Sequence, residues 1–268
     1  MRFRLLLVFG VVALVSACAS STRPGAVGVT REQLFIVSAA EVEQLSSVHY
    51  ANQVAKARSS GKLVASGPEY DRLVKIGNRI IRQASTFRDD TGKWKWQMTL
   101  IDAPTLNASC APGGKITFYA GIIRRLQLTD AEIAAVMGHE VAHALREHGR
   151  EKVSLAQTRN LVTRLAFAQS SNRDQQLAAA NQLANILLTL PNSRESESEA
   201  DRIGLELMAR AGYDPQAAVR FWQKMANASG GNNQIELLST HPVHASRIAE
   251  LTALQPRVRP LFEAAAKP

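Results

Sequence analysis

Cysteine, long apolar runs and clustered basic residues are all scarce in this chain of 268 residues. The two cysteines, Cys18 and Cys110, are too few for a small fold held together by several disulfides. After residue 17 no apolar run reaches the roughly 20 residues that a membrane-spanning helix needs. No repeat recurs at a fixed period, which argues against a solenoid. The net charge is +9, but Lys and Arg form no cluster, so nucleic acid is not expected as a partner.

The N-terminus has the pattern of a secretory signal. Arg2 and Arg4 precede the apolar stretch Leu5–Val15, and small residues follow it. The junction V-S-A-C resembles the lipobox of bacterial lipoproteins, in which the cysteine, here Cys18, becomes the lipidated first residue; Val stands where Leu is usual. An ordinary signal peptide with an incidental cysteine is the alternative. Ala19 after the cysteine favours the periplasmic face of the outer membrane in a Gram-negative cell envelope.

Three parts of the chain are therefore expected. Residues 1–17 form a lipoprotein signal peptide, and residues 18–30, which are small, polar and contain Gly and Pro, form a tether. Residues 31–268 are long enough for one domain with a sizeable core. If lipid occupies Cys18, Cys110 has no partner, so no internal disulfide is expected.

The stretch Thr129–Arg150 predicts an amphipathic helix that carries chemistry on one face. Thr129 can cap its start while Glu132, three residues on, reaches back as in a capping box. Within it, the sequence H-E-V-A-H places His139 and His143 four residues apart, hence on one side of a helix with Glu140 beside them. The opposite side is apolar and suited to packing.

This spacing is typical of a zinc hydrolase. Two neutral imidazoles, from His139 and His143, leave room for a third protein ligand and a water whose pKa the metal lowers to about 7. Glu140 can then act as the general base for that water. The motif also occurs by chance on surface helices, but the cap, the helical phase and acidic residues further along the chain favour the functional interpretation.

Most of the remaining sequence predicts helices, with one small sheet. Helices are expected after Ser38 and from Ser66, the latter with Pro68 in its first turn. Alternation over Trp94–Leu100 predicts a strand, and Lys115–Tyr119 predicts another after a Pro-Gly-Gly turn. An exposed edge strand there could bind an extended peptide, although a purely structural hairpin is an equal alternative. Residues 154–190 predict one or two helices, buried or forming a lid, and 228–233 a flexible loop.

A third zinc ligand must come from elsewhere. His148 lies nine residues after His139, on the far side of a continuous helix, so we expect it to pack or to end the helix. The helix from Ser193 to Arg210 carries Glu197 and Asp201 one turn apart. One of these two can bind zinc while the other orients an imidazole. They share a face with small and apolar residues, whereas Glu195 and Glu199 fall on a charged face expected in water.

Together these motifs resemble a known family. H-E-x-x-H, S-R-x-x-E-x-x-A-D and T-H-P-x-x-x-x-R-I, preceded by N-A-x-x-x-P-G-G, are similar to gluzincin peptidases of the HtpX and CaaX prenyl protease type, and closest to short periplasmic lipoprotein members such as LoiP. The resemblance covers roughly residues 35–255. It implies a zincin-like α+β fold, mostly α-helical, with a small antiparallel sheet beside the H-E-x-x-H helix.

The resemblance also implies roles for particular residues. The ligands of one zinc ion would be His139, His143 and Glu197, with Glu140 as base and Asp201 beside the ligands. His241 would either stabilise the oxyanion or block the zinc at rest, and Arg247 would help hold the site. Separately from the resemblance, the edge-strand hypothesis gives the residues expected to bind substrate, in the segment before the Pro-Gly-Gly turn and in the turn itself: Asn107, Ala108, Pro112, Gly113 and Gly114.

The sequence therefore predicts that residues 31–268 are the domain of a zinc-dependent metalloendopeptidase. Its expected partners are unfolded or misassembled envelope proteins and the membrane, through a lipid anchor. A chaperone-like peptide-binding protein with little proteolysis is the alternative.

Overall fold

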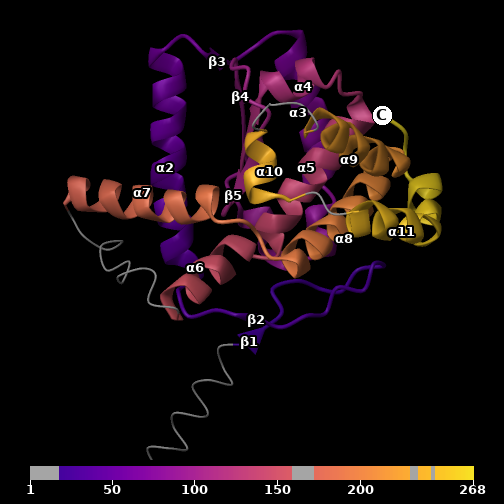
Figure 1. Ribbon diagram of the computed structural model, residues 1–268, viewed down its shortest axis with the longest axis horizontal. Coiled ribbons are helices and arrows are strands. Elements are labelled where there is room, and N and C mark those ends of the chain that lie inside the picture. The colour runs from indigo at the N-terminus through magenta and orange to yellow at the C-terminus, as the bar shows by residue number, and fades with distance from the viewer. Residues whose placement is uncertain (1–17, 159–171, 230–234, 243–244) are drawn as a thin grey trace, which may run out of the picture.

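The helix that carries H-E-x-x-H lies in the middle of the domain. In the computed structural model, which describes residues 18–158, 172–229, 235–242 and 245–268, this helix is α5 (Asp130–Leu145) (Figure 1). The predicted capping box is confirmed: the Thr129 hydroxyl accepts from the Glu132 amide, and the Glu132 carboxylate accepts from the Thr129 amide. Residues 132–145 are all buried, so other elements surround the helix on every side.

Helix α8 (Arg194–Arg210) packs closely against α5. The two helices meet at Gly138 and Gly204, where a Cβ on Gly204 would come within 2.7 Å of the His139 amide nitrogen. Ser193 caps α8 by accepting from the Ser196 amide, and Gly212, with φ of 82°, follows its end. The close approach depends on the absence of side chains at both glycines, and it brings the acidic residues of α8 to the histidines of α5.

A four-stranded sheet lies on the other side of α5. Its strands are β3 (Leu63–Val64), β4 (Gln97–Ile101), β5 (Ala108–Ala111) and β6 (Lys115–Tyr119), in the order β3-β4-β6-β5. The expected mostly helical α+β fold is confirmed, but the sheet is mixed rather than antiparallel because β4 and β6 run parallel. The strand predicted at Trp94 begins only at Gln97, since residues Asp89–Lys93 form the 3-10 helix η2 and Trp96 donates from Nε1 to the Thr91 carbonyl.

The remaining helices enclose this centre. They are α2 (Ala39–Ser59), α3 (Pro68–Ile81), η1 (Ala84–Thr86), α4 (Ala120–Arg125), α6 (His148–Thr158), α7 (Arg173–Thr189), α9 (Gln216–Ser229), α10 (Glu236–Thr240) and α11 (Ala245–Ala264). Helix α3 is capped by Gly67 rather than by the expected Ser66. Helix α7 crosses α2 in Figure 1 and packs with it around a small apolar cluster of its own. Part of the expected lid over 154–190 lies outside the described residues, as does most of the loop at 228–233.

The N-terminal segment packs against the domain. Strand β1 (Cys18–Ala19) pairs with β2 (Gln33–Leu34), and between them Val27 and Val29 are buried in the main core. Much of the segment expected to be a tether therefore contributes to the folded body. The signal peptide expected at 1–17 lies outside the described residues, and the boundary at residue 31 stays a prediction. None of the helices in the described ranges is both long and apolar enough to span a membrane.

Candidate metal centre and catalytic site

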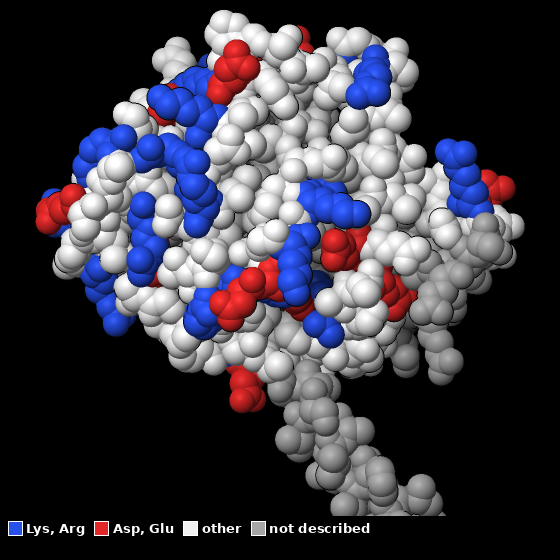
Figure 2. All heavy atoms as spheres, turned by 180° about the vertical axis from the view of Figure 1, so that it is seen from behind, with Lys and Arg blue, Asp and Glu red and all other residues white. Residues whose placement is uncertain are grey.

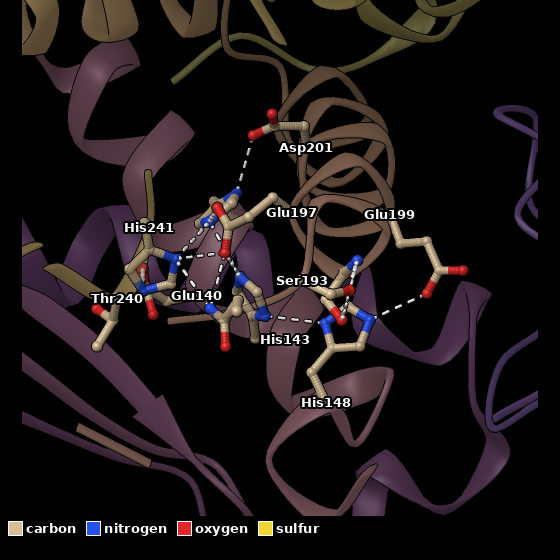
Figure 3. Close-up of polar contacts among 12 residues, drawn as sticks. Glu140, His143, His148, Ser193, Glu197, Glu199, Asp201, Thr240 and His241 are labelled. Atoms are coloured by element: carbon tan, nitrogen blue, oxygen red, sulfur yellow. Dashed lines mark hydrogen bonds and ion pairs between the residues drawn. The ribbon is translucent and has the colours of Figure 1, made fainter. Parts of the chain in front are cut away.

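Four side chains converge at one point in the interior. His139 and His143 come from α5, Glu197 from α8, and His241 directly follows α10. Figure 3 labels His143, Glu197 and His241, which point toward one another. One ligand atom from each lies within 4.8 Å of all the others. The expected set of His139, His143 and Glu197 is thus brought together, and His241 joins it.

The spacing of these atoms matches a tetrahedral zinc site. Zinc bonds of about 2.0–2.1 Å place neighbouring ligand atoms about 3.3–3.4 Å apart. Nε2 of His139 lies 3.1 Å from Nε2 of His143 and 3.4 Å from Oε2 of Glu197, and Nε2 of His143 lies 3.3 Å from Oε1 of Glu197. Two nitrogens and a carboxylate are also a ligand set that zinc prefers, so the residues present fit the ion.

The fourth position in this cluster is taken by His241. Its Nδ1 lies 3.2 Å from Nε2 of His139 and 2.9 Å from Oε1 of Glu197, while its Nε2 faces Glu140 Oε1 at 3.6 Å. The backbone of α10 holds it there, because the His241 amide donates to the carbonyl of Leu237. His241 therefore stands where an incoming ligand of a bound metal would stand.

Asp201 and Arg247 support the first histidine and the glutamate. Nδ1 of His139 lies 3.0 Å from Oδ1 of Asp201, so the ring nitrogen turned away from the cluster faces a carboxylate. Arg247 forms a bidentate pair with Asp201 at 2.7 and 2.8 Å and reaches Glu197 Oε2 at 2.7 Å. Its guanidinium also stacks 3.7 Å from the ring centroid of Trp222. Asp201 and Arg247 thus lie beside the clustered side chains, and their roles stay predictions from the resemblance.

Burial and neighbouring charges shift the pKa values of His139 and Glu197 in opposite directions. Burial would lower the pKa of His139, but contacts with Asp201 and Glu197 raise it to about 9. Burial lowers the pKa of His143, which favours its neutral form. Burial raises the pKa of the Glu140 carboxyl, whereas the neighbouring imidazoles hold the pKa of Glu197 well below its usual value in spite of burial. The clustered negative charge suits a cation.

A cavity of about 140 Å³ opens beside Glu140 and the cluster. Its walls include β5, residues of α2 and the face of α7. Of the residues expected to bind substrate, Asn107, Ala108 and Pro112 line it. Gly113 instead lines a second hollow, and a Cβ on Gly114 would meet the Trp96 ring at 2.6 Å, so these two glycines shape the turn and lie away from this cavity.

His148 is buried, as expected, but the continuous helix assumed for it is wrong, and so is the solvent exposure expected for Glu199. Helix α5 ends at Leu145, and a reversal at Glu147 returns His148 to within 2.8 Å of His143, with Nδ1 facing Nδ1. Glu199, expected in water, is 6% exposed and accepts from His148. Burial would raise the pKa of the Glu199 carboxyl, but hydrogen bonds from His148 and Arg31 outweigh it and lower the pKa to about 2.

Sequence reasoning missed three further residues at the site. Asn192 donates from Nδ2 to Glu197 Oε1 at 2.7 Å. Lys152 lines the cavity and donates to the Leu190 carbonyl at 2.9 Å, which ties α6 to the end of α7. Burial lowers the pKa of Lys152 to about 8. Trp222 packs edge-on against His139 with centroids 5.5 Å apart. None lies in a motif, since their contacts depend on tertiary structure alone.

The four side chains could hold a metal ion, and an acid lies next to them with a cavity beside both. The model of Peptidase family M48 matches residues 69–255, and the chain belongs to that family.

Curated relatives agree with this assignment. The chain is 34% identical to the mitochondrial metalloendopeptidase OMA1 of Saccharomyces cerevisiae, over 63% of this chain and 50% of that protein. It is 39% identical to OMA1 of Arabidopsis thaliana, over 55% of this chain and 29% of that protein. It is 26% identical to the beta-barrel assembly-enhancing protease of Escherichia coli O157:H7, over 78% and 43%. The matched region spans half or less of each relative.

Proposed function

We propose that this protein is a zinc-dependent metalloendopeptidase. The observation that carries the proposal is that ligand atoms of His139, His143 and Glu197 lie at zinc-like spacing, with Glu140 beside the cluster that His241 completes. Zinc bound there would lower the pKa of a water and polarise the scissile carbonyl. The family and its named metalloendopeptidase members support the same conclusion.

The chain's own residues have separate tasks in this proposal. Glu140 takes the proton of the attacking water and passes it to the leaving amine. Asp201 fixes the ring of His139 through Nδ1, and Arg247 holds Asp201 and Glu197 in place. Burial excludes bulk water, which strengthens each of these electrostatic contacts.

An extended polypeptide is the substrate form that the cavity suits. Strand β5 is the last strand of its sheet in the described part of the chain, so one of its edges has no ladder partner there. That strand lines the cavity next to Glu140. A peptide paired with β5 would bring its own carbonyl groups alongside the cluster, with Asn107, Ala108 and Pro112 at the point of contact.

His241 acts, in this proposal, as a block of the resting site. Its Nδ1 lies 3.2 Å from Nε2 of His139 and 2.9 Å from Oε1 of Glu197, close enough to compete for a metal held there, which supports a block rather than the oxyanion role. His241→Ala should then raise activity or self-cleavage. If His241 instead stabilises the oxyanion, the rate should fall about 10²–10³-fold. An unchanged rate would exclude both roles.

We further propose a location and a biological role. The sequence pattern ending at Cys18 supports a short periplasmic lipoprotein on the outer membrane, as in the members related to LoiP. Basic side chains are frequent on the rear face towards the side of α11, at the left of Figure 2, which suits anionic lipid. Turnover of misfolded envelope proteins would fit, since one relative is named as enhancing β-barrel assembly. Cys18→Ser should leave an unprocessed or mislocalised precursor; normal processing would exclude lipidation.

The decisive experiment compares wild type with Glu140→Gln. Each is incubated with an unfolded protein, with and without a chelator, and fragments are identified by mass spectrometry. We expect wild type to cleave only without chelator and Glu140→Gln to bind zinc, to fold, and to lose activity about 10²–10⁴-fold. A zinc-loaded wild type that binds unfolded protein without cleaving it would favour the chaperone-like alternative.

A further inference from the structure

The chain holds an unfavourable backbone conformation directly after the H-E-x-x-H helix. Glu147 has φ of 52°, in the left-handed region that costs a residue with a side chain about 1–2 kcal/mol. Its carboxylate is clamped by Arg88 and Arg150, each at 2.7 Å. Strained backbone conformations that the surrounding structure maintains cluster at functional sites, where they hold residues in place.

What the reversal positions is His148. A continued helix would carry this residue away from His143, whereas the turn starts α6 at His148 and directs the ring back into the site. Its side chain is 2% exposed. One ring nitrogen, Nδ1, lies 2.8 Å from Nδ1 of His143, and the other, Nε2, lies 3.0 Å from Oε2 of Glu199 (Figure 3).

These contacts allow one consistent placement of protons once His143 binds zinc. Its Nε2 faces the cluster, so Nδ1 must carry the proton and donate to Nδ1 of His148. His148 then carries its own proton on Nε2 and donates to the Glu199 carboxylate. In this hydrogen-bonded series from His143 through His148 to Glu199, every ring nitrogen has a partner and no donor faces another donor.

The last residue of this series, Glu199, is held in place by two arginines. Glu199 accepts from Nε of Arg146 at 3.0 Å and from Nε of Arg31 at 2.8 Å. Arg146 is fully buried and Arg31 belongs to the N-terminal segment, where it also pairs with Glu151 at 2.5 Å. Two guanidinium groups keep this carboxylate ionised and in one orientation, so that it can only accept from His148.

We propose that His148 is a positioning residue for the zinc ligand His143, fixing its tautomer and ring plane through a hydrogen bond that Glu199 anchors. This inference deepens the proposed function and depends on zinc binding there. His139 is supported directly by Asp201, whereas His143 is supported through one intermediate imidazole. Removing such outer partners of a metal ligand weakens metal binding about 10–100-fold.

The test measures zinc affinity by competition with a chromogenic chelator, without substrate. His148→Phe keeps a buried ring but cannot accept from His143, so its zinc dissociation constant should rise about 10–100-fold. His148→Gln can both accept and donate, and should recover part of the loss. Glu199→Gln should also weaken zinc binding, whereas the matched control Glu195→Gln, exposed on the same helix, should bind zinc as wild type does.

A spectroscopic measurement separates positioning from a general structural role. In the cobalt-substituted protein, the Nδ1 proton of His143 should give a hyperfine-shifted exchangeable resonance that persists in wild type and disappears in His148→Phe. A folded His148→Phe with wild-type affinity and this resonance intact would overturn the inference. If that variant does not fold, wild-type affinity in Glu199→Gln would overturn it instead. A wild type that binds zinc without cleaving peptides would refute only the peptidase proposal.

Discussion

Gly204→Ala tests whether the close contact of α5 and α8 sets the metal site. A Cβ at this position would lie 2.7 Å from the His139 amide nitrogen, 2.9 Å from the Gly138 carbonyl carbon and 3.0 Å from the His139 Cα. All three are backbone atoms, so no side-chain rotation can relieve the clash and the helices must separate. Because His139 and Glu197 stand on opposite sides of this contact, their separation must change too.

Two opposing contributions decide whether Gly204→Ala raises or lowers the free energy of unfolding. Replacing glycine by alanine inside a helix gains about 1 kcal/mol of propensity, whereas overpacking costs about 1–3 kcal/mol. Since the contact is with rigid backbone, we expect the cost to exceed the gain, with net destabilisation of up to about 2 kcal/mol and weaker zinc binding. Urea titration of chelator-treated protein measures the first effect, and chelator competition the second.

The control for this substitution is Gly92→Ala. No atom lies within 4 Å of a Cβ built on Gly92, so the free energy of unfolding and the zinc affinity should stay near wild type. A Gly204→Ala protein that is as stable as wild type and binds zinc equally well would refute the reasoning.

Two further predictions concern acidic residues. Metal analysis should find no zinc in Glu197→Ala and one zinc per chain in Glu195→Ala. If Glu197→Ala retained zinc, Glu197 would not be a ligand. Burial would raise the pKa of Glu151, but Arg31 and Gln33 hold it below the ordinary 4.5. Its contribution to stability is therefore complete above pH 4.5 and disappears as pH falls through the lower folded value. Glu151→Gln should thus lower the urea midpoint of zinc-free protein at pH 7, with a difference that shrinks in acid; a pH-independent difference would contradict this.

Local patterns predicted the helices that carry the ligands. Three patterns depend on neighbours within a few residues, which the sequence displays directly: the cap at Thr129, the spacing of the two histidines, and the small and apolar face that Glu197 shares. The contact between α5 and α8 therefore agrees with the helical phase deduced for Glu197.

Long-range contacts explain what the sequence did not predict. His148 was assigned by extending a regular helix, and the reversal occurs at Glu147, a residue type that rarely adopts positive φ. Glu199 was assigned to water because it falls on a charged face of its helix, but Arg31, distant in sequence, neutralises it in the interior. Along the chain β5 comes between β4 and β6, but in the sheet it lies at the edge, so β4 and β6 become parallel neighbours and the sheet is mixed. The spacing of the strands in the sequence does not reveal this order.

The packed N-terminal segment limits how far the active site could travel from an anchor. A free tether of 13 flexible residues would reach about 20 Å on average. Instead Cys18 is paired with Leu34, and Arg31 contacts Glu199. If Cys18 carries the lipid proposed above, the folded domain would stay at a nearly constant height above the bilayer. Such a protease would sample the layer of polypeptide adjacent to the membrane, and its working radius would be set by lateral diffusion of the lipid.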